Sequence, residues 1–205
     1  MVSVGILDYN VGNLHSVARA FSLRGDKVKL MSDSREIRNF SHLILPGVGA
    51  FGGAMSVIHE KSFVHEILKF AKSGRPILGI CLGMQLLASS GLEGGTHEGL
   101  NLIAGSVHPL RRTQSLRRVP NIGWRDVEVL CRNSLTNEER HLRTCFAHSY
   151  EFLPQDLSVI VARSLIHTTS IAAVINLDNV WGFQFHPEKS GQAGLNLILR
   201  FLEFS

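Results

Sequence analysis

The stretch PILGICLGMQLL, residues 76–87, carries an apolar strand directly into a helix. Residues 76–80 are apolar on both alternating faces, which is typical of a central strand in a parallel sheet covered on both sides. Cys81 stands at the transition, with Gly79 two residues before it and Gly83 two residues after it. The stretch therefore predicts an α/β fold with a thiol at the end of a buried strand.

Strands and helices alternate on the N-terminal side of this stretch. We expect strands at residues 2–7, 27–31 and 42–45. Asn13 can cap a helix that Gly25 closes, and a second helix ends at Gly74. This succession predicts a doubly wound sheet with helices on both faces.

The pattern changes after about residue 105 to short strands with few helices between them. The candidate strands are residues 105–110, 126–130, 144–150, 157–162, 170–176 and 180–185, and residues 195–204 are expected to form a terminal helix. Part of the second half is therefore expected to be antiparallel, which makes the sheet mixed. The sequence contains no repeat or linker, so residues 1–205 are expected to form one domain.

Composition narrows the functional classes. The 205 residues are 44% hydrophobic and 19% charged, with a formal net charge of +4. Four arginines in residues 111–118 have no aromatic neighbours, so a solvated loop or a contact with an anion or partner is expected, and nucleic acid is not indicated. No apolar run approaches the roughly 20 residues of a membrane span, and no signal peptide is indicated. The three cysteines fit neither a disulfide framework nor a metal site, so we expect a cytoplasmic protein without a metal ion.

Cys81 has the surroundings of a nucleophile. A strand-to-helix turn is tight, and flanking glycines leave room for the neighbouring backbone to approach. The following helix directs free amides toward the sulfur, and the amide of Leu82 is placed to donate to an oxyanion. A buried structural cysteine is the alternative.

His186 is the candidate base. It follows the apolar strand VWGFQF, and Pro187 ends that strand so that the imidazole stands at its end. Glu188 is close enough in sequence to hold the ring nitrogen that faces away from the sulfur. Cys, His and Glu form an ordinary set of nucleophile, base and orienting acid.

The glycine-rich stretch PGVGAFGG, residues 46–53, follows the strand at 42–45. It formally matches a dinucleotide-binding fingerprint, but its strand is not the first and no acidic residue follows at the required distance. A flexible loop whose amides complete an oxyanion hole with Leu82 is the preferred interpretation. A structural turn is the other alternative.

Three motifs in order, GICLGMQLL, PGVGAFG and FQFHPEKS, resemble those of the class I, triad-type glutamine amidotransferases. DYNVGNLHSV, VPNIGW and FAHSY further resemble the glutaminase subunits of imidazole glycerol phosphate synthases. The resemblance spans nearly the whole chain. It implies a flavodoxin-like fold, hydrolysis of L-glutamine without a cofactor, and a heterodimer in which ammonia passes to a (β/α)8-barrel cyclase.

The resemblance also implies roles for individual residues. Cys81, His186 and Glu188 match the catalytic triad. The oxyanion positions match Val48, Gly49 and Leu82, and the glutamine-binding positions match Gln85, Glu93, Ser149 and Tyr150. Positions near the synthase interface match Asn13, Trp124 and Lys189.

The chain departs from the family pattern at two positions near Trp124, and Asn101 also stands where glycine is common. The usual pattern P-H-x-G-W-N is replaced here by a segment with Asn121 and Arg125 at the His and Asn positions. These changes leave the glutaminase interpretation intact but bear on which synthase is served. A paralogue that feeds a sugar-amidating synthase, a stand-alone cysteine hydrolase and a non-catalytic binding protein are the alternatives.

Overall fold

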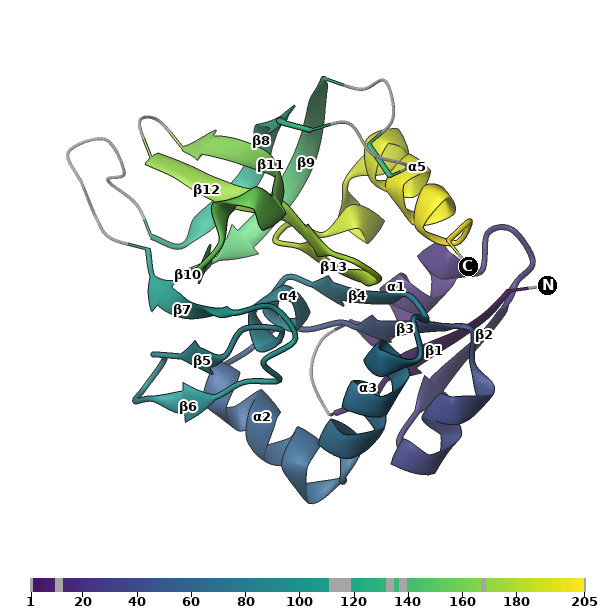
Figure 1. The fold of residues 1–205 in the computed structure, drawn as a ribbon. Coiled ribbons are helices and arrows are strands. Elements are labelled where there is room, and N and C mark those ends of the chain that lie inside the picture. The colour runs from purple at the N-terminus through teal and green to yellow at the C-terminus, as the bar shows by residue number, and fades with distance from the viewer. Residues whose placement is uncertain are drawn as a thin grey trace.

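The computed structural model describes residues 2–9, 13–110, 119–131, 135–136, 140–166 and 169–204. The arginine-rich stretch at 111–118 lies outside the described residues. Within the described part, the strands form one large sheet and one small sheet, and helices cover the large sheet (Figure 1).

The large sheet contains nine strands among the described residues, in the order β2-β1-β3-β4-β13-β12-β11-β8-β9. Its parallel part consists of β2 (Lys27–Met31), β1 (Ser3–Leu7), β3 (His42–Leu45), β4 (Ile77–Ile80) and β13 (Val180–Phe183). Its antiparallel part consists of β12 (Thr169–Leu177), β11 (Ile160–Ile166), β8 (Asn121–Val129) and β9 (His141–His148). The predicted mixed sheet is therefore confirmed.

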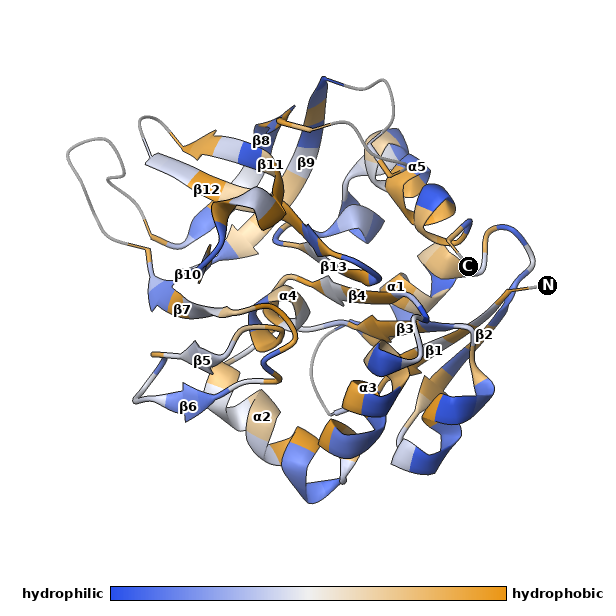
Figure 2. Cartoon of the chain, in the orientation of Figure 1, coloured by the Kyte–Doolittle hydropathy of each residue, from blue (hydrophilic) through white to orange (hydrophobic). Residues whose placement is uncertain are grey.

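Helices bury both faces of the parallel part. On one face, α2 (Phe51–Glu60), α3 (Phe63–Lys72) and α4 (Leu82–Leu86) pack against strand residues that include Leu43 and Leu45. On the other face, α1 (Leu14–Phe21) and α5 (Gly191–Phe201) pack against residues that include Ile44. Figure 2 shows apolar residues concentrated on the central strands and on the inner sides of the helices. Because successive strand residues point to opposite faces, this double burial explains the continuous apolar runs in the sequence.

A second, four-stranded sheet lies beside the large one in the order β10-β7-β5-β6. Its strands are β10 (Tyr150–Pro154), β7 (Gly105–Pro109), β5 (Ser90–Gly91) and β6 (His97–Glu98). The segment expected as one strand at 144–150 is divided between β9 in the large sheet and β10 in the small one. Ser149 lies at the junction, so this short segment connects the two sheets.

Several expected boundaries were wrong. Helix α1 ends at Phe21, and Gly25 instead serves a following turn with φ of 78°. Strand β8 begins five residues before its expected start, at Asn121, and α5 spans Gly191–Phe201 rather than 195–204. Short 3-10 helices span Ser34–Asn39, Leu157–Val159 and Pro187–Lys189.

The expected glycine-rich loop at 46–53 was too long, because α2 begins at Phe51. Gly52 lies inside this helix, where an added Cβ would stand 2.6 Å from the ring of His97. That glycine therefore serves close packing between α2 and β6. The loop that remains after β3 spans residues 46–50.

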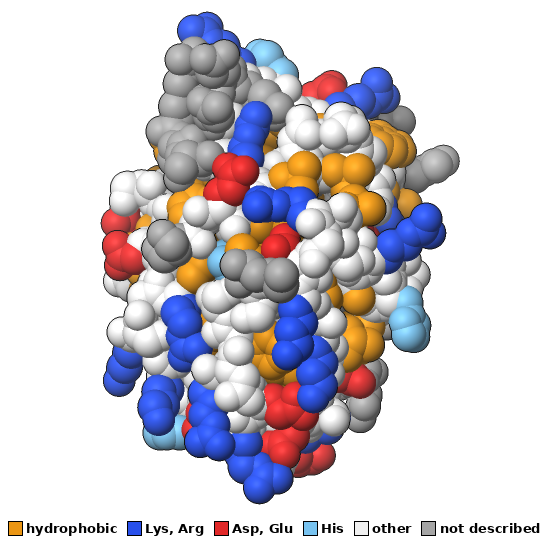
Figure 3. All heavy atoms as spheres, turned by 90° about the vertical axis from the view of Figure 1, so that its right-hand side faces the viewer, with side chains coloured by type: hydrophobic (Ala, Val, Ile, Leu, Met, Phe, Trp, Pro, Cys, Tyr) orange, Lys and Arg blue, Asp and Glu red, His pale blue; other side chains and the backbone are white. Residues whose placement is uncertain are grey.

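Charged side chains are mixed on the molecular surface seen in Figure 3. Lysine and arginine are spread over this face and are interrupted by acidic and apolar side chains. Among the described residues, no helix combines the length and the apolar character that crossing a membrane requires.

Candidate active site

The carboxyl ends of four adjacent parallel strands meet at one edge of the large sheet. Tyr9 follows β1, Pro46 follows β3, Cys81 follows β4, and His186 lies three residues beyond β13. Ligands in open α/β sheets bind at this edge, where the strand order changes direction. The topology thus brings together residues that are far apart in the sequence.

Cys81 occupies a tight turn between β4 and α4. Its backbone has φ of 55° and ψ of −107°, an unfavourable conformation for a residue with a side chain. The flanking glycines permit the turn, because a Cβ on Gly79 would lie 2.5 Å from the Gly83 oxygen and one on Gly83 would lie 1.7 Å from the Leu45 oxygen. This confirms that the glycines are required for close backbone approach.

The sulfur of Cys81 lies among polar groups although the residue is only 4% exposed. Its thiol donates to the carbonyl of Ala147 at 3.8 Å, and Nε2 of Gln184 donates to the sulfur at 3.9 Å. Helix α4, which begins at the next residue, is five residues long. The amide of Gln184 therefore offers a direct donor to a thiolate in addition to the helix backbone.

His186 and Glu188 form a buried pair. Nδ1 of His186 lies 3.0 Å from Oε1 of Glu188, and each side chain is 4% exposed. The turn that carries them is fixed to β9, since the backbone amide of His186 donates to the carbonyl of Cys145 at 2.9 Å. Nε2 of His186 has no hydrogen-bond partner among the described residues, so this nitrogen is available for a proton transfer.

The electrostatic surroundings favour the charged form of His186. Burial lowers the pKa of this imidazole, but the nearby Cys81 sulfur and the Glu188 carboxylate outweigh burial and raise the pKa to about 9. A protonated imidazole beside a thiol stabilises the thiolate that nucleophilic attack requires.

The expected oxyanion donor Leu82 is already in use. Its amide donates to the carbonyl of Gly47 at 3.4 Å, a long and weak hydrogen bond. Because the C=O and N–H of a trans peptide point in opposite directions, the amide of Val48 in the same peptide points away from Leu82. The loop therefore presents an acceptor where an oxyanion hole needs a donor.

Tyr9 holds the start of this loop. Its hydroxyl, fully buried, donates to the carbonyl of Pro46. Burial, and the proximity of Cys81, raise the pKa of Tyr9 far above its ordinary value, so the phenol stays protonated. A Cβ on Gly47 would stand 2.7 Å from this hydroxyl, which explains the glycine.

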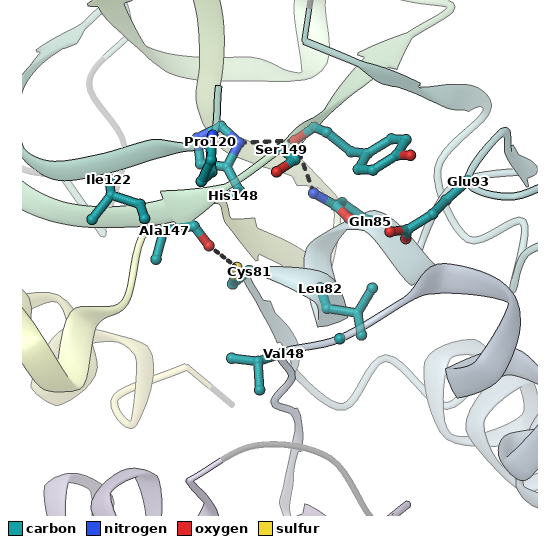
Figure 4. Close-up of a pocket in the computed structure, with 12 residues that line it drawn as sticks. Val48, Cys81, Leu82, Gln85, Glu93, Pro120, Ile122, Ala147, His148 and Ser149 are labelled. Carbon is teal, nitrogen blue, oxygen red and sulfur yellow. Dashed lines mark hydrogen bonds between the residues drawn. The ribbon is translucent and has the colours of Figure 1, made fainter. Parts of the chain in front are cut away.

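A pocket of about 220 Å³ opens above the sulfur of Cys81 (Figure 4). It is lined by Val48, Gly49, Cys81, Leu82, Gln85, Glu93, Pro120, Ile122, Ala147, His148, Ser149 and Tyr150. All four residues expected to bind glutamine are among them. The structure thus brings the expected substrate-binding and oxyanion positions together around the thiol.

The side chains of Gln85 and Glu93, two of the expected substrate-binding residues, also have structural partners. Nε2 of Gln85 donates to the carbonyl of Tyr150 at 3.0 Å and to Oε1 of Gln184 at 3.2 Å. Oε2 of Glu93 accepts a hydrogen bond of 2.7 Å from the amide of Phe51, the first residue of α2. This carboxylate therefore caps α2 from outside the helix and faces the pocket at the same time.

Two of the three expected interface residues line one cavity next to His186. Asn13 caps α1 through a hydrogen bond of 3.2 Å from the amide of Ser16. Asn13 and Lys189 line a smaller cavity of about 140 Å³ that also touches His186 and Val48. Trp124 is 46% exposed on β8. Its contact with a partner stays a prediction.

Sequence reasoning missed several residues of the site. Pro120, Ile122, Ala147 and His148 line the pocket, and Gln184 lies at the sulfur. The motifs VPNIGW, FAHSY and FQFHPEKS contain all five, so these motifs were the available signal. Their individual positions depend on the pairing of β8 with β9, which the sequence does not specify.

The described residues contain no group of three or more His, Cys, Asp or Glu side chains arranged to hold a metal ion. The three cysteines are free thiols. What the site offers is a nucleophile, an acid–base pair and a pocket, which suits amide hydrolysis through a thioester.

Comparison with known proteins identifies the family. Residues 5–203 match the family "Glutamine amidotransferase class-I". A HisH 1 subunit of imidazole glycerol phosphate synthase from Legionella pneumophila (strain Lens) is 43% identical, and the match covers 99% of this chain and 100% of the relative. The chain belongs to the HisH family of class-I glutamine amidotransferases.

Another HisH subunit, from Chlorobium chlorochromatii (strain CaD3), is 39% identical over 98% of this chain and 99% of the relative. A solved structure described as a glutamine amidotransferase has a TM-score of 0.77 and 21% identity, covering 98% of this chain and 97% of that one. The structural likeness confirms the class I fold. Membership of this family supports a glutamine-hydrolysing enzyme subunit, and the roles of the individual site residues stay predictions.

Proposed function

We propose that this chain, the glutaminase subunit of an imidazole glycerol phosphate synthase, hydrolyses L-glutamine with Cys81 as nucleophile, His186 as base and Glu188 as orienting acid. The observation that supports it most directly is the turn at Cys81, which is strained at φ of 55° and faces a pocket. The buried His186–Glu188 pair next to that turn supports the acid–base roles. We take residues 1–205 as one catalytic domain.

The chemistry follows from these positions. The Cys81 thiolate attacks the carboxamide carbon of glutamine, and the resulting tetrahedral adduct carries its negative charge on the former carbonyl oxygen. His186 then donates its proton to the leaving nitrogen, and ammonia departs to leave a glutamyl thioester. Water, deprotonated by His186, attacks the thioester and releases glutamate, which restores the thiol and imidazole.

Gln85, Glu93, Ser149 and Tyr150 bind glutamine in this proposal. Glutamine carries an α-ammonium group and an α-carboxylate besides the reacting amide. The carboxylate of Glu93 matches the ammonium group, and the polar groups of Ser149 and Tyr150 match the remaining acceptors. The position of these residues around the pocket supports the assignment.

The partner is the cyclase subunit of the synthase, and we propose that it is a (β/α)8 barrel forming a heterodimer with this chain. Three apolar side chains are exposed at the pocket or beside it: Val48 at 43%, Ile122 at 64% and Trp124 at 46%. Exposed apolar residues at one place are typical of a surface that binds another protein. We place the complex in the cytoplasm, where its free cysteines stay reduced.

Binding of the partner also activates the site in this proposal. With the Gly47 carbonyl on the Leu82 amide, the loop withholds the Val48 amide from the oxyanion. Loss of one oxyanion donor costs about 10²–10³ in rate. A partner that binds the reoriented loop more tightly shifts this equilibrium by its differential affinity.

The test is the glutaminase kcat of the chain alone, with the cyclase subunit, and with cyclase plus its bound ligand. The rate should rise at each step. Equal rates in all three would contradict activation by the partner. Labelling of Cys81 by a glutamine-like electrophile tests the nucleophile separately, and failure to label it would contradict the triad.

A further inference from the structure

Two of the departures from the family pattern, Asn121 and Arg125, lie at the start of β8, beside the pocket residues Pro120 and Ile122. Strand pairing places Asn121 directly opposite His148 on β9. Arg125 is half-buried and joins three groups of its own strand. Its Nε donates to Oδ1 of Asn121 at 3.0 Å, and its terminal nitrogens donate to the carbonyls of Trp124 and Ile122.

The orientation of the Asn121 amide follows from Arg125. An arginine can only donate hydrogen bonds, so the atom of Asn121 that faces it must be the oxygen. The amide nitrogen of Asn121 then faces Nε2 of His148 at 2.9 Å and must donate to it. Nε2 is therefore the acceptor nitrogen of this ring, and Nδ1 carries the proton.

The protonated Nδ1 of His148 extends this series of hydrogen bonds into the pocket. It donates to the carbonyl of Tyr150 at 2.8 Å, and Figure 4 shows this bond together with the one from Gln85 to the same oxygen. Burial lowers the pKa of His148 to about 4, against the opposing effect of the Tyr150 carbonyl, so the ring is neutral at physiological pH. A neutral ring with one proton fits both of its hydrogen bonds.

The last hydrogen bonds of the series run through Gln85 and Gln184 to the sulfur of Cys81. Both hydrogens of the Gln85 amide are donated, one to the Tyr150 carbonyl and one to Oε1 of Gln184. The Gln184 amide in turn donates to the sulfur of Cys81 at 3.9 Å. Gln85, Gln184, Asn121 and His148 are each at most 5% exposed, so a reversed amide or ring would leave buried polar groups unpaired.

We propose that Arg125 and Asn121 are positioning residues of the glutamine site, which fix the hydrogen-bond direction of His148 and thereby hold the Tyr150 and Gln85 wall of the pocket. Neither residue touches the reacting atoms. With its amide hydrogens committed to the wall, Gln85 offers its carbonyl oxygen to the substrate. A carbonyl oxygen can only accept hydrogen bonds, so it suits a donor group of the substrate, such as the ammonium or amide group of glutamine.

This inference rests on the proposed function and refines it. Because the wall binds substrate and does not transfer protons, its disturbance should raise KM more than it lowers kcat. We would measure both constants for glutamine with the chain assembled with its cyclase subunit. The glutaminase activity of the parent complex tests the proposed function itself. The positioning roles are tested only by the ratios of KM and of kcat between each variant and the parent.

Arg125→Met keeps the apolar stem and removes every donor of the guanidinium. The Asn121 amide can then reverse, which should raise KM about tenfold, the loss expected for one buried hydrogen bond, with kcat within about threefold. Arg125→Lys keeps one donor and should restore KM to within about threefold of the parent. Arg143→Met, on the exposed side of neighbouring β9, is the matched control and should leave both constants unchanged.

Asn121→Asp keeps the size of the side chain and the bond from Arg125 but removes the donor to His148. The ring should then take a proton on Nε2, which nitrogen NMR of labelled histidine in the isolated chain detects directly. The inference would be overturned by a KM for Arg125→Met within twofold of the parent. It would also be overturned if Nε2 of His148 stayed unprotonated in Asn121→Asp. If Asn121→Asp fails to fold, the Arg125 variants decide the question.

Discussion

The parallel and antiparallel parts of the large sheet position their functional groups by different means. In the parallel part, the ends of β3, β4 and β13 deliver the loop at Gly47, Cys81 and the turn at His186 mainly through strand ends and tight backbone turns. In the antiparallel part, β8 and β9 hold the pocket wall through a series of buried side-chain hydrogen bonds that begins at Arg125. One part depends on backbone geometry and the other on the direction of polar side chains.

This difference predicts different consequences of substitution. A change in the parallel part removes a reacting group or blocks a close backbone approach, so its effect on kcat is large. A change in the antiparallel part alters how substrate or partner is held, so its effect is smaller and is seen in KM or in activation.

The largest effect is expected from Cys81→Ala. The substitution removes a small group from a turn that glycines already make possible, so the fold should persist while glutamine hydrolysis falls by about 10⁴-fold or more. Steady-state ammonia release and thermal unfolding measure the two properties. Cys131→Ser at an exposed position is the control and should retain full activity, whereas substantial hydrolysis by Cys81→Ala would refute the nucleophile assignment.

His186→Ala should be the next most damaging change, and Glu188→Gln should be milder. In the proposed mechanism the imidazole transfers the protons, whereas the carboxylate orients and stabilises the imidazole through the 3.0 Å contact. We expect kcat to fall about 10³–10⁴-fold for the first variant and clearly less for the second. Single-turnover release of ammonia distinguishes them, and the reverse ranking would contradict their assigned roles.

The pH dependence of kcat/KM tests the same roles of His186 and Glu188. Because Cys81 and Glu188 raise the pKa of His186 to about 9, kcat/KM should fall as the pH rises through about 9 and the imidazolium loses its proton. Glu188→Gln removes one charge that raises this pKa, so the falling limb should move to lower pH. A limb that does not move would mean that another group titrates.

The raised pKa of His186 also affects folding stability. The pKa of His186 in the folded chain lies above its ordinary value of 6.5, so the folded state binds this proton more tightly than the unfolded state. Its contribution to the free energy of unfolding is therefore complete below about pH 6.5 and is lost as the pH rises through about 9. Urea unfolding of the parent and of His186→Ala across that range should show the difference narrowing at high pH.

The smallest effect on the chemistry is expected from Trp124→Ala in the antiparallel part. The ring is 46% exposed and does not line the pocket, so the kcat of the isolated chain should stay within about twofold. Activation by the cyclase subunit should weaken, because the proposed apolar contact of Trp124 with that subunit would be lost. Titration of cyclase against glutaminase rate measures this. Leu165→Ala, at another exposed apolar position, is the matched control for a nonspecific surface effect.

The sequence by itself determined the doubly wound parallel core and the triad candidates. Residues 76–80 are apolar on both faces because helices cover both sides of β4, and such a run is readable without a structure. The glycines beside Cys81 also indicate the turn from sequence alone. Backbone that approaches within about 3 Å leaves no room for any side chain, so only glycine fits there. Local chemistry thus indicated both the turn and its thiol.

Only the tertiary structure decided how the pocket wall is built. The pairing of Asn121 with His148 depends on the register between β8 and β9, which alternating polarity alone does not set uniquely. The contact of Glu93 with the start of α2 crosses 42 residues, and the bond from Gln85 to Gln184 crosses 99. These partners become neighbours only when the strands assemble, since a side-chain hydrogen bond depends on distances in space that the order of residues does not contain.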